Sequence, residues 1–231
     1  MESAKQHPSL DLWLHDVQSY IYRSTNEFMK QAGFQFNRSG FCYKRKNKES
    51  LDELSFIFLN HFPVKCRISF QLEIWHPKIR YVKEYFMNEI LIKESNLCSI
   101  IMFMKDFPSH DPQQEIVNDY SICDHKDLFM VAGWLTQTLQ DEILPFYDQL
   151  NSISCMDDFF TANPDWSLNT HSGGNICTDL IVSKLNRRRD FSLRYQQLMH
   201  GLQQKIENRP IKSDCRELLS LCYESMLNHK W

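Results

Sequence analysis

The segment 65–75 constrains the fold most strongly, because its side chains alternate between two chemical classes. Its apolar positions are Cys66, Ile68, Phe70, Leu72 and Ile74, and polar side chains separate them. A period of two is that of a β-strand, whose successive side chains point to opposite faces of a sheet. One face of this strand should therefore pack on a core while the other meets solvent, as is typical of antiparallel sheets.

Three more strands are expected at about 41–46, 53–60 and 97–105. The segment 53–60 carries apolar side chains on both faces, with Leu54 and Phe56 on one face and Ile57 and Leu59 on the other. A strand that is apolar on both faces is typical of the interior of a sheet, so this strand is predicted to be central. The pattern indicates an antiparallel sheet of about four strands.

Segments with helical periodicity lie before and after these strands in the sequence. Residues 9–31 place apolar or small side chains at spacings of three and four, and Gly33 supplies a left-handed stop. The stripe consists of Leu10, Leu14, Val17, Ile21, Ser24 and Phe28. Further helices are expected at 78–93, at 124–144 and near 155–160, with a kink or new turn at Pro145. Residues 107–120 are polar and contain prolines, which predicts a long exposed loop.

The sequence pattern changes between residues 163 and 174, from mixed strand and helix periods to helical periods alone. Beyond this point three apolar stripes of helical period follow one another with short connections, which indicates antiparallel helices. We therefore expect an α+β domain over 1–165 and a helical appendage of three helices over 175–231, packed on the first domain. The predicted fold class is α+β: an antiparallel sheet packed against helices, with a C-terminal helical appendage.

The charge balance disfavours a nucleic-acid partner. The chain has 26 basic and 29 acidic residues, a formal net charge of −3, and proteins that bind duplexes usually have a basic surface. Two short basic clusters, 44–48 and 187–189, lie beside predicted turns and are interpreted as solvated faces.

The cellular compartment is predicted from cysteines and from hydropathy. The eight cysteines are scattered without a CxxC pair, and residues 1–9 lack the apolar stretch of a signal peptide. No apolar run approaches the roughly 20 residues that a transmembrane helix needs. We expect a cytoplasmic protein with reduced thiols that does not enter the membrane.

No motif assigns a catalytic residue, a metal site or a cofactor. His61, Cys66 and His76 lack the close pairing of structural zinc ligands, and Cys123 with His125 shows no further sign of a nucleophile and its base. The glycines at 173–174 lack the spacing of a phosphate-binding loop. We expect no cofactor and no metal.

The polar face of the strand at 65–75 is the best candidate for partner binding. Five residues form this set: Arg67, Gln71, Glu73, Trp75 and His76. Arginine and tryptophan are favoured anchors in protein interfaces. The alternative is that a helix or the C-terminal appendage covers this face, and the sequence leaves both possibilities open.

Several short motifs occur in the order of a known family. Gly33-Phe34 ends a helix, a strand carries Phe41 and Tyr43, Phe70-Gln71-Leu72 lies in a later strand, and 143–148 reads Ile-Leu-Pro-Phe-Tyr-Asp. Over roughly residues 9–160 the chain resembles a bacterial domain-of-unknown-function family of helix-flanked antiparallel-sheet proteins. That family is similar to toxin-immunity and defence-associated domains.

The resemblance implies a non-catalytic protein-binding protein. This would be an immunity-type inhibitor, or an accessory subunit of a bacterial defence or toxin system, with a toxin or a complex subunit as its partner. The alternative is an enzyme with a dispersed active site, a hydrolase or nuclease whose catalytic groups meet only in the folded chain. The C-terminal helices offer a third possibility, a module for homo-oligomerisation or for docking.

Overall fold

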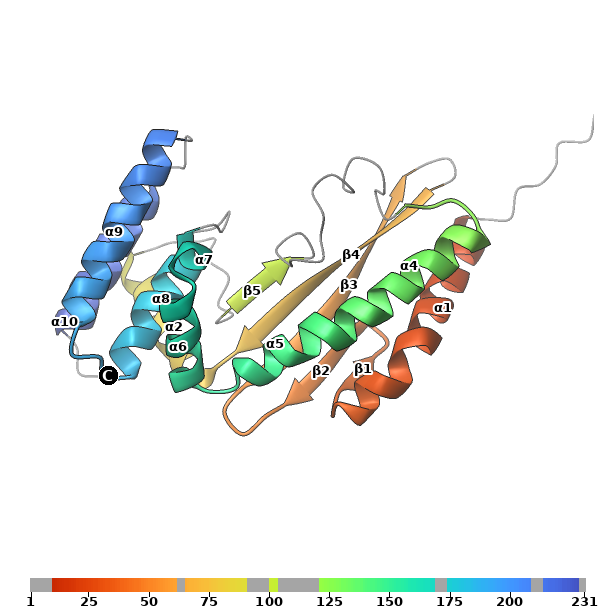
Figure 1. Cartoon of the computed structure of the whole chain (residues 1–231), viewed down its shortest axis with the longest axis horizontal. Helices are drawn as coiled ribbons and strands as arrows, with labels where there is room; N and C mark the ends of the chain where they lie inside the picture. Colours follow the sequence, from red (N-terminus) through yellow and green to blue (C-terminus); the bar gives the residue numbers. More distant parts are fainter. Residues whose placement is uncertain are drawn as a thin grey trace, which may run out of the picture. The chain divides into compact units, whose positions relative to one another are not determined.

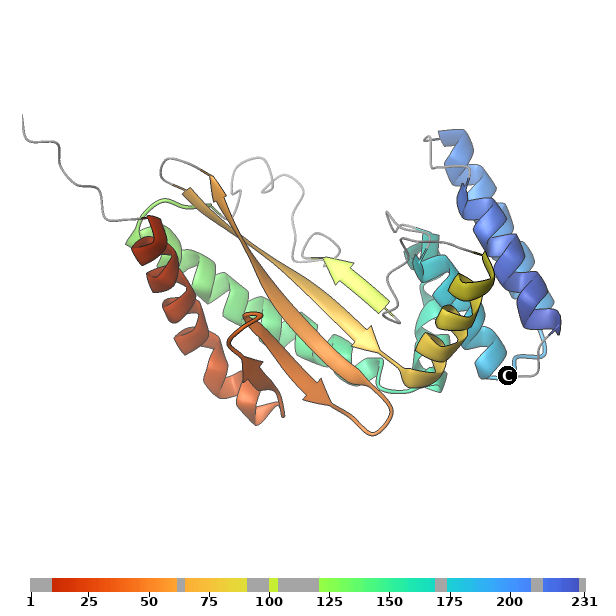
Figure 2. The ribbon, with the colours of Figure 1, turned by 180° about the vertical axis from the view of Figure 1, so that it is seen from behind.

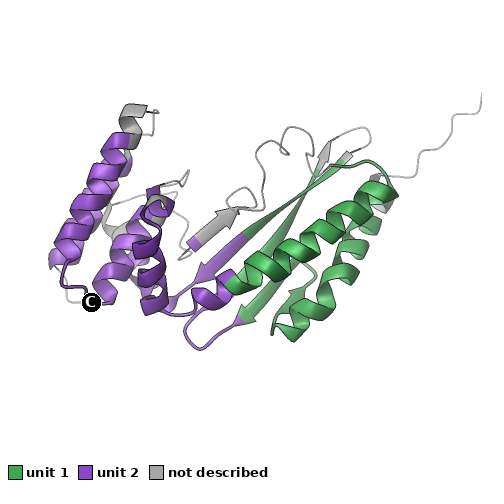
Figure 3. Cartoon of the chain, in the orientation of Figure 1, with its two compact units in different colours: residues 1–45, 53–71, 102–145 green, residues 46–52, 72–101, 146–231 purple. Residues whose placement is uncertain are grey.

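The computed structural model describes residues 10–61, 65–90, 100–103, 121–168, 174–208 and 214–228. The chain forms two compact units (Figure 3). Unit 1 consists of Met1–Arg45, Glu53–Gln71 and Met102–Pro145, and unit 2 of Lys46–Asp52, Leu72–Ile101 and Phe146–Trp231. This division differs from the boundary expected from the sequence, because the strands at the centre of the sheet contribute residues to both units.

The described residues form a six-stranded sheet (Figure 1). Its strands are β1 Gln35–Asn37, β2 Cys42–Lys46, β3 Leu51–His61, β4 Lys65–Trp75, β5 Ile100–Phe103 and β6 Ser121–Ile122. The order is β1-β2-β3-β4-β5, with β6 paired to β4 as well. The α+β prediction is confirmed, and β3 is central as expected. The four predicted strands correspond to β2–β5, whereas β1 and β6 are too short to show a period.

Burial along β4 follows its sequence pattern. Its apolar residues from Cys66 to Ile74 are all buried, and the residues between them are half-buried. The antiparallel register pairs Cys66 with Ile122 and Arg67 with Ser121 of β6. The alternation predicted for this strand is confirmed.

Two helices of unit 1, α1 Leu10–Gln31 and α4 His125–Thr138, pack against each other on one face of the sheet (Figures 1 and 2). The buried row of α1 is Val17, Ile21, Thr25 and Met29. Leu14, Ser24 and Phe28 of the predicted stripe are only half-buried, so the prediction of the buried row was wrong at these positions.

Thr25 is buried because its hydroxyl group has two partners. It donates to the carbonyl oxygen of Ile21 (2.8 Å) and lies 3.0 Å from the hydroxyl of Tyr43 in β2. Burial of Tyr43 raises the pKa of its phenol to about 12, so this hydroxyl remains protonated and can donate to Thr25.

A long helix follows β6. Asp124 caps α4 by accepting the N–H of Asp127 (2.9 Å), and the Asp127 carboxylate accepts the N–H of Cys123 (3.0 Å). The helix widens into the π-helical segment η2 Leu139–Ile143 and continues as α5 Leu144–Gln149. Pro145 has no N–H and its ring crowds the carbonyl four residues earlier, so a widened turn before it relieves that contact.

Unit 2 is mostly helical. Its helices are α2 Pro77–Ile90, α6 Ile153–Ala162, α7 Pro164–Leu168, α8 Gly174–Leu185, α9 Phe191–Asn208 and α10 Asp214–Asn228. The three predicted C-terminal helices are α8, α9 and α10. The expected loop at 107–120 lies outside the described residues.

Helix α8 forms the centre of this unit. It contacts α2, α6, α7, α9 and α10, and every residue from 176 to 183 is buried. A helix surrounded on all sides has no solvated face, so its polar residues must find partners inside the protein. Because α6 and α7 pack on α8, they belong with the C-terminal helices rather than with the preceding residues.

Candidate functional site

The sheet of unit 1 has one face that α1 and α4 do not cover (Figure 2). We call it the open sheet face. Its residues are Glu53, Ser55, Ile57 and Leu59 of β3, and Arg67, Ser69 and Gln71 of β4. All are half-buried except Leu59, whose exposed fraction is 43%. As the sequence predicts, β3 carries apolar side chains on both of its faces. Two of them, Ile57 and Leu59, therefore lie on the open sheet face.

One corner of the open sheet face is held by a cross-strand ion pair. The Nζ atom of Lys44 in β2 lies 2.9 Å from Oε2 of Glu53, and Ser55 donates to the other carboxylate oxygen at 3.5 Å. Burial raises the pKa of the neighbouring Cys42 thiol, and the Glu53 carboxylate raises it further. Cys42 therefore stays protonated, and this corner is a structural contact rather than a nucleophilic site.

The residues proposed for partner binding do not form a single set. Arg67 and Gln71 lie on the open sheet face of unit 1, whereas Glu73, Trp75 and His76 belong to unit 2. Glu73 and Trp75 are half-buried on the same strand. His76 is only 2% exposed, so the structure does not place its ring on a binding surface.

His76 is buried because it joins β4 to α2. Its carbonyl oxygen accepts the N–H of Arg80 in the first turn of that helix (2.9 Å). Burial lowers the pKa of the imidazole, and Glu49, whose Oε2 lies 3.6 Å from Nε2, acts in the opposite direction. Burial has the larger effect, so the ring is neutral at neutral pH.

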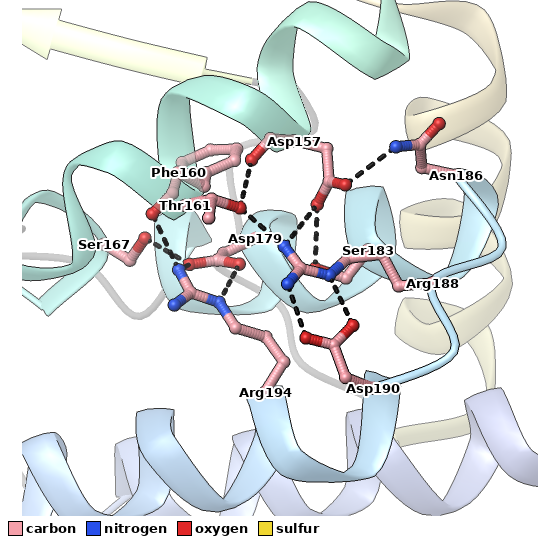
Figure 4. Close-up of polar contacts among 10 residues, drawn as sticks. All are labelled: Asp157, Phe160, Thr161, Ser167, Asp179, Ser183, Asn186, Arg188, Asp190 and Arg194. Atoms are coloured by element: carbon pink, nitrogen blue, oxygen red, sulfur yellow. Dashed lines mark hydrogen bonds and ion pairs between the residues drawn. The ribbon is translucent and has the colours of Figure 1, made fainter.

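Within the part of the chain that the structure describes, a cluster of charged side chains lies in unit 2 (Figure 4). Asp157, Asp179 and Arg194 are buried in it, whereas Arg188 is half-buried and Asp190 is exposed. Its first part is the ion pair between Asp179 of α8 and Arg194 of α9. Two of the three guanidinium nitrogens of Arg194, Nε and Nη2, donate to the Asp179 carboxylate. Arg194 Nη2 also donates to the carbonyl oxygen of Phe160 (2.8 Å), and Ser167 donates to Asp179 at 2.6 Å. This part connects α6, α7, α8 and α9.

The second part is centred on Asp157 of α6. Its carboxylate accepts Ser183 of α8 at 3.2 Å and Asn186 at 2.7 Å. Arg188 donates to Asp157 at 3.4 Å and binds Asp190 through Nε (2.8 Å) and Nη2 (2.6 Å). These hydrogen bonds lower the pKa of Asp190 to about 2.

The interpretation of the basic cluster 187–189 as a solvated face is therefore wrong for Arg188. Arg187 and Arg189 are exposed, as expected for a solvated loop, but Arg188 turns inward to Asp157 and Thr161. In Figure 4 the acidic and basic side chains point toward one another, so their charged groups are occupied with each other. We interpret this cluster as a structural network that joins four helices.

Sequence reasoning missed this network, although one signal was present. Asp179 and Ser183 are four residues apart within the most apolar part of the C-terminal region. Polar residues inside such a run are typical of buried positions with partners, but their partners are distant in the sequence.

The described residues contain no group of three or more histidine, cysteine or acidic side chains arranged to hold a metal ion. Among them there is also no helix that is long and apolar enough to cross a membrane. Comparisons with models of protein families, with curated proteins and with solved structures found no match for this chain.

Proposed function

We propose that this protein is a non-catalytic protein-binding protein that docks its partner on the open sheet face of unit 1. One observation supports this most: Leu59, 43% exposed, and Ile57 lie between polar side chains on a face that α1 and α4 leave uncovered. Docking would remove these apolar groups from water, which contributes roughly 25 cal/mol per Å² of apolar area buried.

Arg67 and Gln71 would supply specificity next to this apolar pair. A guanidinium group offers several N–H donors in a plane, and an amide offers both a donor and an acceptor. Interfaces typically combine a small apolar centre with such polar groups at its rim. The partner surface would then carry an apolar side chain beside carboxylate or carbonyl oxygens.

The biological class of the proposal rests on the resemblance in sequence. The motifs at Gly33-Phe34 and 143–148 are similar to a bacterial family related to toxin-immunity and defence domains. On that basis the protein acts as an immunity-type inhibitor or as an accessory subunit of a bacterial defence or toxin system.

The test is affinity capture from the native host with four tagged chains: wild type, Leu59→Glu, Arg67→Glu and Met130→Glu. Met130 is 57% exposed on α4, on the other side of the same unit, and so provides a matched control for a new surface charge. Captured proteins are identified by mass spectrometry, and circular dichroism checks that each variant is folded.

We expect wild type and Met130→Glu to capture the same stoichiometric protein. Both substitutions on the open sheet face should reduce capture about tenfold or more, the effect of losing roughly 1.4 kcal/mol at an interface. A wild-type protein that purifies alone would contradict the proposed function. Equal loss with all three variants would contradict the placement of the binding surface.

A further inference from the structure

Helix α4 has a solvent-facing side on which two large apolar side chains lie next to each other. Phe129 and Met130 are 58% and 57% exposed, although the solvent side of a helix usually carries polar groups. Adjacent exposed apolar side chains of this size mark an interaction surface. We call this side the α4 face. Its residues are linked by spacings of three and four and are all exposed: Lys126, Phe129, Met130, Gly133, Gln137 and Gln140.

Helix α1 extends this apolar surface. The Tyr20 ring packs edge-on against Phe129, with 5.0 Å between the ring centroids, and the Trp13 ring packs in a similar way against His125 (5.4 Å). Tyr20 and Trp13 are half-buried. The contact with Tyr20 orients the Phe129 ring while more than half of Phe129 stays in water, so docking on it would cost little side-chain order. Aromatic and methionine side chains are also enriched in protein interfaces.

The middle of the α4 face has no side chain over it. Gly133 is exposed, and no atom lies within 4 Å of the position that a Cβ atom would take there. A facing helix can therefore place its own large side chains over Gly133, beside Phe129 and Met130. Two such faces are complementary in shape, because the apolar pair of one can lie over the glycine of the other.

Opposite charges lie at the two ends of the α4 face. Lys126 is seven residues before Gly133, Asp141 of η2 is eight residues after it, and both are exposed. At a rise of 1.5 Å per residue, each charge lies about 10–12 Å from the glycine along the helix. Within the described residues neither side chain forms an ion pair. The face therefore has a positive end and a negative end at nearly equal distances from its centre.

We propose that the α4 face binds a second copy of this chain, with the two α4 helices antiparallel about a two-fold axis near Gly133. Such an interface uses the same surface of both copies, so each contact occurs twice. Lys126 of each copy then faces Asp141 of the other, and the apolar pairs of both copies meet in the middle. A parallel arrangement would place Lys126 against Lys126, so the charges select the antiparallel one. This charge complementarity identifies a second copy as the occupant.

The dimer leaves the open sheet face accessible, because α4 packs on the opposite face of the sheet (Figure 2). The proposal is therefore independent of the partner that binds on the open sheet face. Met130→Glu would lose the dimer and still capture that partner, so it remains a control for the capture experiment.

The interface is small. Phe129 and Met130 each leave about 100 Å² exposed, so two copies bring together roughly 400 Å² of apolar surface. Permanent dimers bury several times this area. We therefore expect a weak dimer that depends on protein concentration, with a Kd on the order of 10–100 μM.

The test is sedimentation equilibrium of the full-length reduced chain from about 5 to 500 μM, a range that spans the expected Kd. The average mass should rise with concentration from 27.6 kDa toward twice that value. Phe129→Glu should weaken the dimer about tenfold or more, because it removes an apolar anchor and places two carboxylates near the axis. Leu193→Glu, at a leucine of α9 in unit 2 that is 52% exposed, is the matched control and should dimerise like wild type. Circular dichroism checks that each variant is folded.

Charge reversal tests the antiparallel arrangement. Lys126→Glu and Asp141→Lys should each weaken the dimer about three- to tenfold, because each variant creates two like-charge contacts across the axis. The double variant Lys126→Glu/Asp141→Lys restores opposite charges at both contacts. Its Kd should return to within about twofold of the wild-type value.

Three results would overturn the proposal. The first is a wild-type chain that stays monomeric at every concentration. The second is a dimer that Leu193→Glu dissociates and Phe129→Glu does not, since that dimer would form through the C-terminal helices. The third is a double charge-reversal variant that binds no more tightly than the single variants, because the two charges would then not face each other.

Discussion

Arg194 provides the sharpest test of the buried network, because its guanidinium group has partners on two other helices. Replacing Arg194 with methionine preserves much of the apolar stem and removes the hydrogen bonds to Asp179 and to the carbonyl oxygen of Phe160. Asp179 would then be a buried carboxylate whose remaining contact in the network is the hydroxyl of Ser167 (2.6 Å).

The expected cost follows from the burial of both partners. Removing one member of a buried ion pair leaves an uncompensated charge and typically costs about 3–5 kcal/mol of unfolding free energy. For a protein of this size, each kcal/mol shifts the melting temperature by about 2–4 °C, so Arg194→Met should melt roughly 6–20 °C lower. Arg189→Met, at an exposed arginine of the preceding loop, should change stability by less than about 0.5 kcal/mol.

A double-mutant cycle distinguishes the ion pair from simple packing. Asp179→Leu alone should also be strongly destabilising, because it leaves Arg194 as a buried cation. The double variant Asp179→Leu/Arg194→Met removes both charges and should be less destabilised than the sum of the single variants by at least about 2 kcal/mol. Urea unfolding followed by circular dichroism measures all four proteins. A cost below about 1 kcal/mol for Arg194→Met, or additive single costs, would refute the structural role of the pair.

Two further predictions concern helix glycines and a buried histidine. Gly133→Ala should stabilise α4 by about 0.5–1 kcal/mol, because no atom lies within 4 Å of the added methyl group. Gly201→Ala should gain less or lose stability in the same thermal melt, because its methyl group would meet Cδ1 of Leu168; an equal gain would contradict the packing of α7 on α9. The pKa of His76, followed by NMR titration, should be below 6.5 and should fall further in Glu49→Gln; a rise in that variant would be inconsistent with the contact. Because the unfolded chain takes up this proton first, the free energy of unfolding should decrease as the pH falls from about 6.5 through the pKa of the folded protein.

Sequence periodicity was sufficient where an element buries one face along its whole length. The alternation over 65–75 predicted β4 with its correct bounds and its buried residues. The spacing over 9–31 predicted α1 within one residue, and the helix expected from residue 124 begins there, with Asp124 as the cap of α4. In each case residues within a few positions of one another carry the signal, so a local pattern is enough.

Local patterns failed where a neighbour distant in the sequence decides burial. Thr25 replaces Ser24 on the buried row of α1 because Tyr43 provides a partner for its hydroxyl group. The strands β1 and β6 contain three and two residues, too few for a period, and exist because β2 and β4 offer edges to pair with. His76 was placed on a surface because it follows Trp75 at the end of the polar sheet face, but the turn into α2 buries it.

The sequence by itself determined the types and approximate limits of most elements, the α+β class and the polar character of one sheet face. Only the tertiary structure decided which side chains meet, such as Arg188 with Asp157 and Arg194 with Asp179. These two pairs are 31 and 15 residues apart. Secondary structure depends on interactions within a few residues, whereas these contacts depend on how helices pack, and a single sequence carries no direct signal of that packing.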